Sequence, residues 1–330
     1  MASIPMLFAL EASREFGESV ARTLEVPLSE HEEREFEDGE HKARPLVEVR
    51  NRHAYVVQSL HGRGGQSVDE KLVRLLFFIG ALKESGAARV TAVLPYLCYA
   101  RKDRRTKPHD PVTTRYVAML FEAVGTDGVL AVDVHNPSAF ENAFRCSTEH
   151  LEARHVFVAP VADFIGADDA LVLSPDAGGV KRAERFREVL ERHLKRPAGN
   201  GFMEKKRSGG VVSGEQLVGD VTNKTIIIVD DLIAGGTTLA RAAEACKKRG
   251  ARRMIAVATH GVFAPGADDK LGQSPLEHIF IGDTIPPAAL DPAFLQQRVE
   301  VIGLGPFIAE AIRRLHGGES LADLSQVYGY

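Results

Sequence analysis

The segment at residues 225–239, TIIIVDDLIAGGTTL, constrains the fold of this chain more than any other stretch. β-Branched apolar residues fill positions 226–229, and a continuous apolar run of this kind is typical of a buried parallel strand. Small and hydroxylated residues follow at positions 234–238, and a helical pattern begins at Leu239. We therefore expect a strand–turn–helix unit within an α/β fold.

The chemistry of this segment predicts a site for a sugar phosphate. A turn of glycines and threonines lets backbone N–H groups and hydroxyls point at a phosphate, and the start of a helix favours negative charge. The adjacent carboxylates Asp230 and Asp231 would repel a phosphate, but they suit the vicinal hydroxyls of a sugar or a divalent cation. The alternative is an ordinary strand–turn–helix with a solvated acidic turn. The candidate ribose 5-phosphate site comprises Asp230, Asp231, Gly235, Gly236, Thr237 and Thr238.

Composition narrows the class of protein and its environment. With 330 residues, the chain is long enough for two domains. Its formal net charge of −4 gives no electrostatic reason to expect a nucleic acid partner. The three cysteines are far apart and form no CxxC pair, so we expect a reducing compartment and no thiolate metal cluster. Apolar runs are too short for a membrane span and no signal peptide is evident, so we predict a cytoplasmic protein without membrane contact.

Strand-like apolar runs alternate with helix-length amphipathic segments along the chain. This alternation predicts mostly parallel sheets flanked by helices, in which ligands bind beyond the carboxyl ends of the strands. We expect a first domain at residues 1–150, a second at 151–305, and a C-terminal segment at 306–330 that packs back on the first. The expected strands are at residues 5–10, 54–58, 89–94, 128–133, 170–174, 225–229 and 253–259, and the expected helices at 13–24, 68–85, 112–124, 180–194, 239–249 and 306–315.

A basic loop, YARKDRR, follows the strand expected at residues 89–94. Guanidinium groups pair two phosphate oxygens at once, so this density of cations predicts polyphosphate recognition. A solvated basic loop without a ligand is the alternative. The candidate cations are Arg101, Lys102, Arg104 and Arg105.

Two further strand ends carry candidate metal ligands. His135 follows the strand expected at 128–133, and Asp176 follows the strand expected at 170–174. Mg²⁺ prefers oxygen ligands and retains waters, so a histidine contact requires help from a carboxylate. A purely structural histidine is the alternative interpretation of His135.

The segment at residues 196–218 is rich in glycine and serine and carries three consecutive cations, Lys205, Lys206 and Arg207. We predict a mobile loop that closes over an anion. Cations of this kind neutralise charge on a phosphoryl group in transfer, whereas a basic loop without a role is the alternative. No P-loop, GxGxxG or GxSxG motif is present, so a Walker ATPase, a dinucleotide dehydrogenase and an α/β-hydrolase are not supported.

Taken together, these segments resemble the ribose-phosphate diphosphokinase family, also called phosphoribosyl pyrophosphate (PRPP) synthetase. The resemblance runs from about residue 36 to the C-terminal helix, with many separate motifs in the family's order. They are FEDGE at 36–40, VLPYLCYARKDRR at 93–105, DPVTTRYVA at 110–118, VDVH at 132–135, SPDAGGVKRA at 174–183, KKR at 205–207, VGDV at 218–221, the 225–239 segment, ATHGVF at 258–263 and AEAIRRLHGGES at 309–320.

The resemblance implies a fold and an activity. The expected fold is two tandem type I phosphoribosyltransferase-like domains, each with a mostly parallel sheet flanked by helices. The expected reaction transfers the β,γ-diphosphoryl group of ATP to O1 of ribose 5-phosphate, giving PRPP and AMP for nucleotide biosynthesis, with Mg²⁺ as cofactor. A homo-oligomer built from dimers, commonly a hexamer, is also implied.

The resemblance also implies residue roles. ATP is bound by Phe36, Asp38, Glu40, Arg101, Lys102, Asp103 and His135, the first three reaching the adenine of a neighbouring subunit. His135 and Asp176 hold the metal, and the acidic pair with the Gly235–Thr238 turn binds ribose 5-phosphate. The residues assigned to catalysis are Lys205, Arg207 and His135.

The chain departs from the family pattern in several places. Ala234 replaces a third aspartate of the phosphate loop, and Lys102 stands where the family usually has Gln. Residues 108–110 and 303–305 differ in regions that contribute to allosteric phosphate and ADP binding in the family, so we expect altered regulation. The alternatives to an active diphosphokinase are a PRPP-consuming phosphoribosyltransferase, a non-catalytic regulatory paralogue, and a diphosphokinase or kinase with a different sugar-phosphate or nucleotide preference.

Overall fold

The computed structural model describes residues 4–62, 65–208, 211–322 and 324, with the side chains of residues 205–215 outside the description. The chain divides into two compact units. The first holds the residues up to Glu152 together with Gly305–Leu324, and the second holds Ala153–Leu304. Among the helices of these described residues, none combines the length and the hydrophobicity of a membrane span.

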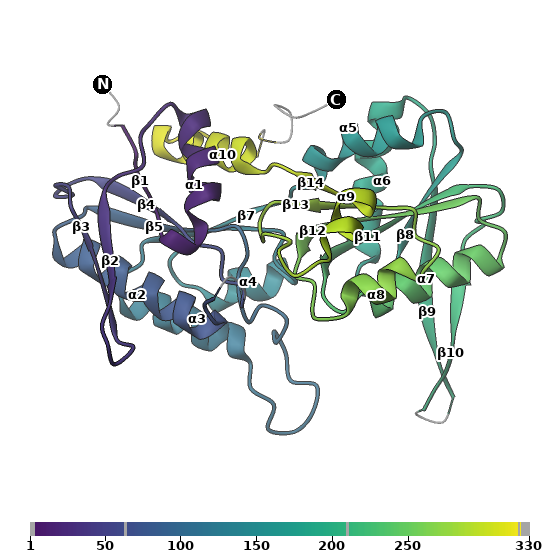
Figure 1. The fold of residues 1–330 in the computed structure, drawn as a ribbon, viewed down its shortest axis with the longest axis horizontal. Helices are drawn as coiled ribbons and strands as arrows, with labels where there is room; N and C mark the ends of the chain where they lie inside the picture. The colour runs from purple at the N-terminus through teal and green to yellow at the C-terminus, as the bar shows by residue number, and fades with distance from the viewer. Residues whose placement is uncertain (1–3, 63–64, 209–210, 323, 325–330) are drawn as a thin grey trace. The chain divides into compact units, whose positions relative to one another are not determined.

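The first unit is a parallel sheet covered by helices on both faces (Figure 1). Helices α1 (Arg14–Leu24) and α10 (Gly305–Gly317) lie side by side on one face, and α2 (Val68–Glu84) and α3 (Thr113–Ala123) cover the other. The short helix α4 (Pro137–Ala143) precedes the last strand, and a 3₁₀ turn at Glu11–Ser13 precedes α1. In spatial order the strands are β1 (Met6–Ala9), β4 (His53–Val57), β5 (Arg89–Leu94), β6 (Gly128–Val132) and β7 (Ser147–Leu151).

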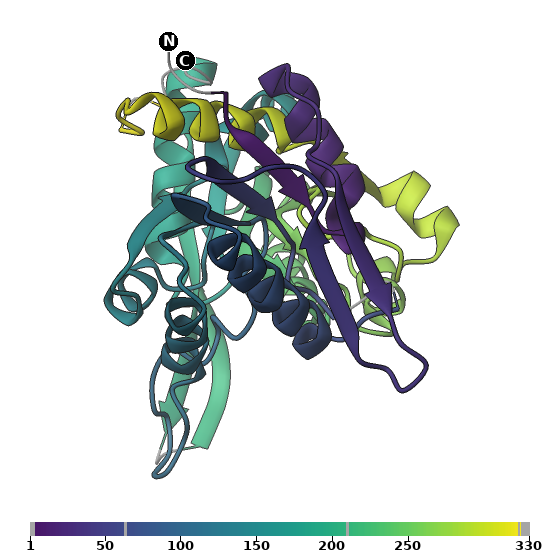
Figure 2. The same ribbon diagram turned by 90° about the vertical axis from the view of Figure 1, so that its left-hand side faces the viewer.

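An antiparallel hairpin of β2 (His31–Glu35) and β3 (His41–Pro45) extends from the first unit beside α2 (Figure 2). Arg74 of α2 donates to Glu35 at 2.6 Å, and the ring of His41 stacks on Phe77 at a centroid distance of 5.5 Å. The sequence did not predict this hairpin, because its strands are charged and partly exposed and lack the apolar runs of the parallel strands.

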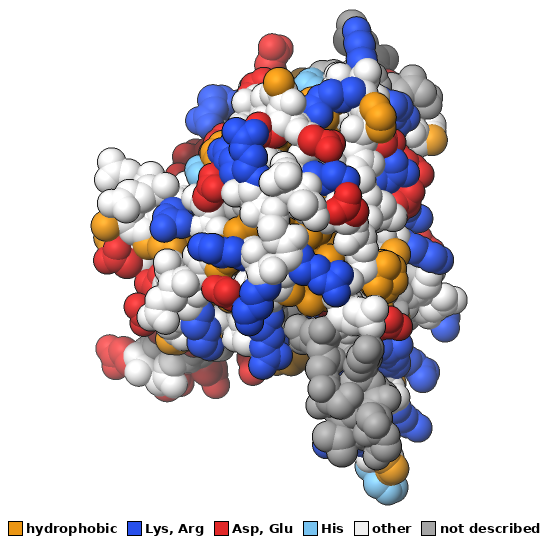
Figure 3. Space-filling model, turned by 90° about the vertical axis from the view of Figure 1, so that its right-hand side faces the viewer, with side chains coloured by type: hydrophobic (Ala, Val, Ile, Leu, Met, Phe, Trp, Pro, Cys, Tyr) orange, Lys and Arg blue, Asp and Glu red, His pale blue; other side chains and the backbone are white. Residues whose placement is uncertain are grey.

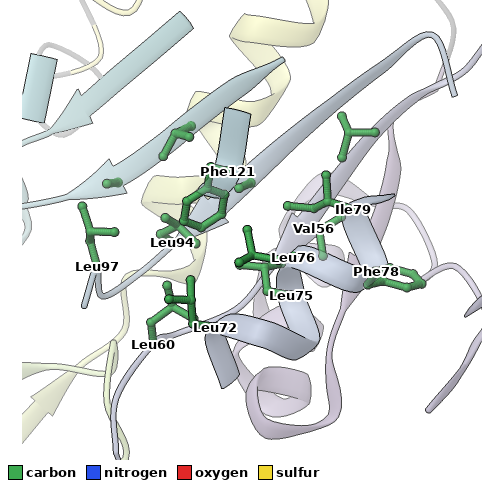
Figure 4. Close-up of a cluster of buried hydrophobic side chains, with 14 of the residues drawn as sticks. Val56, Leu60, Leu72, Leu75, Leu76, Phe78, Ile79, Leu94, Leu97 and Phe121 are labelled. Carbon is green, nitrogen blue, oxygen red and sulfur yellow. The ribbon is translucent and has the colours of Figure 1, made fainter. Parts of the chain in front are cut away.

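The core of the first unit lies between the sheet and helix α2 (Figure 4). Ser67 and Glu70 form a reciprocal capping box that fixes where the helix begins. Apolar residues at helical spacing then face the sheet, and each fully buried large side chain stabilises the fold by roughly 1.5–3 kcal/mol. The labelled core residues are Val56, Leu60, Leu72, Leu75, Leu76, Phe78, Ile79, Leu94, Leu97 and Phe121.

The second unit has a larger sheet whose strands are parallel except for the pair β9–β10. Helices α5 (Arg154–Ile165) and α6 (Val180–Leu194) cover one face, and α7 (Thr237–Lys248) and α8 (Ala267–Gly272) cover the other (Figure 1). Helix α9 (Pro292–Arg298) precedes the last strand. In spatial order the strands are β10 (Val211–Val218), β9 (Gly199–Ser208), β8 (Ala170–Ser174), β11 (Thr225–Ile233), β12 (Arg253–Gly261), β13 (His278–Gly282) and β14 (Val299–Ile302).

The expected α/β architecture with mostly parallel sheets is therefore present in both units, but two local predictions were wrong. The segment predicted as a mobile loop forms the antiparallel strands β9 and β10, in which the buried residues Met203 and Leu217 pair. Strand β11 continues past its predicted end at residue 229 to Ile233, because β12 pairs with it as far as Gly261.

Candidate functional site

The acidic pair of the second unit lies within the carboxyl-terminal part of β11. Asp231 is buried and Asp230 is half-buried. The Asp231 N–H donates to Oδ1 of Asp230 at 2.9 Å. β11 is a central strand of its sheet, and its apolar residues are buried. The strand therefore holds both carboxylates firmly at the carboxyl-terminal end of the sheet.

Arg182 is the cation that faces this pair. It lies in the first turn of α6, and its Nη1 lies 3.3 Å from Oδ1 of Asp230 and 3.5 Å from Oδ1 of Asp231. Burial raises the pKa of Asp230, the hydrogen bond and charge of Asp231 raise it further, and the Arg182 guanidinium opposes the shift. Sequence reasoning missed Arg182, although it stands within the SPDAGGVKRA motif.

The turn after β11 has the geometry of an anion cradle. Gly236 has φ 74° and forms the N-cap of α7, and a Cβ at this position would lie 2.8 Å from Leu271 Cγ. Only glycine therefore fits without strain. Within the described chain, the N–H groups of residues 235–238 donate to no acceptor, and the side chains of Thr237 and Thr238 are exposed. These donors, at the start of a helix, are suited to a phosphate.

A second cation, Lys270 of α8, lies beside this turn. Its Nζ is 4.0 Å from the point where a Cβ on Gly235 would stand, and it forms no ion pair with any described residue. Ala234 occupies the neighbouring position without a carboxylate, so the turn carries less negative charge than the family pattern predicts. Lys270 was also missed by sequence reasoning, because its separation from Gly235 along the chain gives no signal.

Asp176 follows β8, the strand beside β11. Its Oδ1 accepts from the N–H groups of Gly178 at 2.8 Å and Gly179 at 3.0 Å, which shapes the turn into α6. Its Oδ2 accepts no hydrogen bond from the described residues. The structure thus brings Asp176, the acidic pair and the Gly235–Thr238 turn to the same carboxyl-terminal edge of one sheet.

In the first unit, two predicted segments meet at the carboxyl ends of β5 and β6. Oδ2 of Asp103 accepts from Nδ2 of Asn136 at 2.5 Å, and Asn136 also caps α4. His135, the residue before it, is exposed. The loop containing Arg101 and Asp103 therefore lies next to the histidine, as expected for strand ends at one edge of a parallel sheet.

The other predicted nucleotide residues lie elsewhere in this unit. Lys102 of the β5 loop pairs with Asp110 at 2.6 Å. Phe36, Asp38 and Glu40 occupy the turn between β2 and β3, where the Phe36 N–H donates to the Glu40 carbonyl at 2.7 Å. Phe36 is exposed, with the Arg34 guanidinium 5.1 Å from its ring centroid.

The predicted catalytic cations fall on the β9 strand. The backbones of Lys205 and Arg207 pair with Glu215 and Val212 of β10, but their side chains lie outside the described residues. Their catalytic role stays a prediction. Among the residues that the structure does describe, no three histidines, cysteines or carboxylates cluster as a metal site.

Comparison with known proteins finds the family that the sequence resembles over nearly the whole chain. The N-terminal domain of ribose phosphate pyrophosphokinase matches residues 5–125, and the phosphoribosyl synthetase-associated domain matches residues 210–326. Ribose-phosphate pyrophosphokinase of Aquifex aeolicus is 34% identical, with 96% of this chain and 98% of that protein covered. Ribose-phosphate pyrophosphokinase 4 of Saccharomyces cerevisiae is 33% identical, with 96% and 94% covered.

A solved structure shows the same fold. The crystal structure of phosphoribosylpyrophosphate synthetase from Mycobacterium smegmatis superposes with a TM-score of 0.86 at 30% identity, covering 96% of this chain and all of the other. Two α/β units, each with a mostly parallel sheet, define an enzyme with a phosphoribosyltransferase-like fold. The chain belongs to the ribose-phosphate pyrophosphokinase family, which confirms both the resemblance and the enzyme assignment made from the sequence.

Proposed function

We propose that this chain transfers the β,γ-diphosphoryl group of ATP to O1 of ribose 5-phosphate and releases PRPP and AMP. In this reaction the bond between O1 and the β-phosphorus forms, the bond between the β-phosphorus and its bridging oxygen to the α-phosphate breaks, and the O1 proton is released. The observation that carries the proposal is the carboxyl end of β11. There the half-buried Asp230 and the buried Asp231 precede a turn at the start of α7 whose N–H groups donate to no acceptor among the described residues.

The residues at this sheet edge divide the binding of ribose 5-phosphate between them. Asp230 and Asp231 accept hydrogen bonds from the ribose hydroxyls, and Arg182 holds their oxygens in place. The Gly235–Thr238 turn binds the 5-phosphate through N–H groups and hydroxyls. Catalysis of phosphoryl transfer then depends mainly on positioning and on cations near the equatorial oxygens.

Mg²⁺ is the cofactor that we propose, with Asp176 as its protein ligand in the second unit; the assignment of His135, in the first unit, stays a prediction from the resemblance. The donor chemistry fits, because the Asp176 carboxylate has one oxygen fixed by two N–H groups and one without a partner among the described residues. A magnesium ion usually takes one or two protein ligands and completes its shell with water and substrate phosphates. When bound, it would neutralise charge on the triphosphate.

The substrates that we propose are small anions. Basic and acidic side chains are interspersed on the face shown in Figure 3, and the net charge is −4, so the charge distribution does not favour nucleic acid.

We also propose a homo-oligomer built from dimers, in which the exposed turn with Phe36, Asp38 and Glu40 reaches a neighbouring subunit. Light scattering coupled to size exclusion tests the oligomer, and a monomer at all concentrations would refute it.

The function is tested by incubating the protein with Mg²⁺, ATP and ribose 5-phosphate and following the products by ³¹P NMR. We expect AMP and PRPP in equal amounts. ADP would indicate a simple kinase instead. Turnover with another pentose phosphate but not ribose 5-phosphate would show that Ala234 has changed the sugar preference. No turnover together with tight binding to an active synthetase would indicate a regulatory paralogue.

A further inference from the structure

The loop after β5 is organised around one carboxylate oxygen. Oδ2 of Asp110 accepts from Lys102 Nζ at 2.6 Å, Thr106 Oγ1 at 2.7 Å, the Lys107 N–H at 3.0 Å and the Thr106 N–H at 3.1 Å. Lys102 Nζ also lies 3.3 Å from Thr106 Oγ1. These bonds close residues 102–110 into a ring of side-chain and backbone contacts. The lowered pKa of Asp110, caused first by Lys102 and then by Thr106, agrees with this arrangement.

Further contacts tie the same loop to its surroundings in the first unit. The Tyr99 hydroxyl donates to Asp69 of α2, and Asp103 accepts from Asn136. Thr114 Oγ1 donates to the carbonyls of Tyr99 at 3.1 Å and Lys102 at 3.3 Å. The loop is therefore fixed at both ends and in its middle.

The cations of this loop divide into two kinds. The guanidinium groups of Arg101, Arg104 and Arg105 are exposed and make no hydrogen bond or ion pair with any residue that the structure describes. The ammonium group of Lys102, in contrast, is half-buried and directed at Asp110. A carboxylate at 2.6 Å competes directly with a phosphate oxygen for this ammonium group.

We propose that Lys102 and Asp110 are positioning residues: their ion pair holds the β5 loop so that its arginines bind the triphosphate, and Lys102 does not contact the nucleotide itself. This inference rests on the proposed function for the identity of the nucleotide. A preformed loop avoids the entropy loss of ordering its residues when ATP binds. The pair accordingly acts on the affinity for ATP more than on the chemical step.

Five variants test the proposal: Asp110→Ala, Lys102→Met, the double variant, the conservative Asp110→Glu, and Lys107→Met as a control that removes an exposed ammonium group of the same loop. We expect Asp110→Ala to raise KM for ATP about tenfold and to change kcat less than about twofold, since it removes ground-state binding. The double variant should match Asp110→Ala, because the two residues act as one unit. Lys107→Met should retain the KM for ATP, and Asp110→Glu should recover part of the loss.

The opposite pattern would overturn the proposal. If Lys102 binds ATP directly, Asp110→Ala frees the ammonium group and leaves KM unchanged or lower, whereas Lys102→Met raises it. Hydrogen exchange provides a readout that does not need turnover. The Thr106 and Lys107 amides should exchange faster in Asp110→Ala, and unchanged exchange would refute the proposal that the Lys102–Asp110 pair holds the loop. Should the wild type form no PRPP, the proposed function fails separately, and calorimetric titration of the same variants with ATP and Mg²⁺ still decides the role of the pair.

Discussion

At the scale of single residues, Asp230 gives the chain a measurable pH dependence. Its folded-state pKa is raised above the ordinary value of 3.8, first by burial and then by Asp231. Above that ordinary value the unfolded chain has lost the proton while the folded chain keeps it, so the free energy of unfolding decreases as pH rises towards the raised pKa.

Replacing Asp230 by Asn removes this contribution. We expect the free energy of unfolding to decrease less between pH 5 and pH 8 in Asp230→Asn than in the wild type, by about 1.4 kcal/mol for each pH unit of this range over which the folded carboxyl group keeps its proton. Urea titration at the two pH values measures this difference. Asp163→Asn, which changes an exposed carboxylate of α5, is the control and should retain the wild-type dependence. Equal decreases in wild type and Asp230→Asn would show that Asp230 is ionised in the folded protein across this range.

Lys270 gives a second prediction at this scale, because its ammonium group forms no ion pair with any described residue and lies beside the Gly235–Thr238 turn. A charge-assisted hydrogen bond contributes about 1.5–3 kcal/mol. We expect Lys270→Met to raise KM for ribose 5-phosphate about tenfold or more and to leave KM for ATP unchanged. Lys248→Met, at the far end of α7, is the matched control. Equal effects of the two substitutions would indicate a general loss of charge rather than a contact with the 5-phosphate.

At the scale of elements, the strand–turn–helix at β11 and α7 depends on the conformation of Gly236. Alanine at this position has an unfavourable positive φ, and its Cβ would overlap Leu271 at 2.8 Å. We expect Gly236→Ala to destabilise the protein by about 1–3 kcal/mol and to weaken binding of ribose 5-phosphate. Gly235→Ala is the comparison for stability alone, because its Cβ would meet only Lys270 Nζ, at an ordinary contact distance of 4.0 Å. Calorimetry that shows the same melting temperature for both variants would contradict this account.

The elements that the sequence predicted share one property. The strands at residues 89–94 and 170–174 and the helix at 180–194 have the predicted bounds, because continuous apolar runs and helical periodicity reflect burial directly. The hairpins β2–β3 and β9–β10 were missed because polar strands at the edge of a fold are stabilised by pairing, which a single sequence does not reveal.

The candidate site could likewise be predicted from the sequence only in part. Carboxylates and glycines that follow apolar strands could be assigned from the sequence, since strand ends in a parallel sheet meet at one edge. Arg182 and Lys270 could not, because their partners Asp230 and Gly235 are distant along the chain and are brought near only by packing. The Lys102–Asp110 pair was also missed: its members are close in sequence, but only the fold of the loop turns the ammonium group inward.

At the scale of the whole molecule, the chain leaves the first unit at Glu152 and returns to it at Gly305. Helix α10 is therefore part of the first unit, although the second unit separates it from the rest in sequence. Its apolar face is fully buried, through Phe307, Ile308 and Ile312. Helix α1 packs beside it, and Gly305 approaches so closely that a Cβ there would lie 2.2 Å from Ser19 Oγ.

This connectivity predicts that a substitution in the core of one unit destabilises that unit and leaves the other unchanged. We expect Phe307→Ala to cost about 3–5 kcal/mol, because it removes a large buried ring, and to weaken amide protection in residues 4–152 and 305–322 only. Phe186→Ala removes an equally buried ring from α6 and should weaken protection only within residues 153–304. Native-state hydrogen exchange followed by mass spectrometry measures both. Equal loss of protection across the whole chain in either variant would mean that the two units unfold as one cooperative body, and α10 would then stabilise the molecule as a whole rather than the unit to which it belongs.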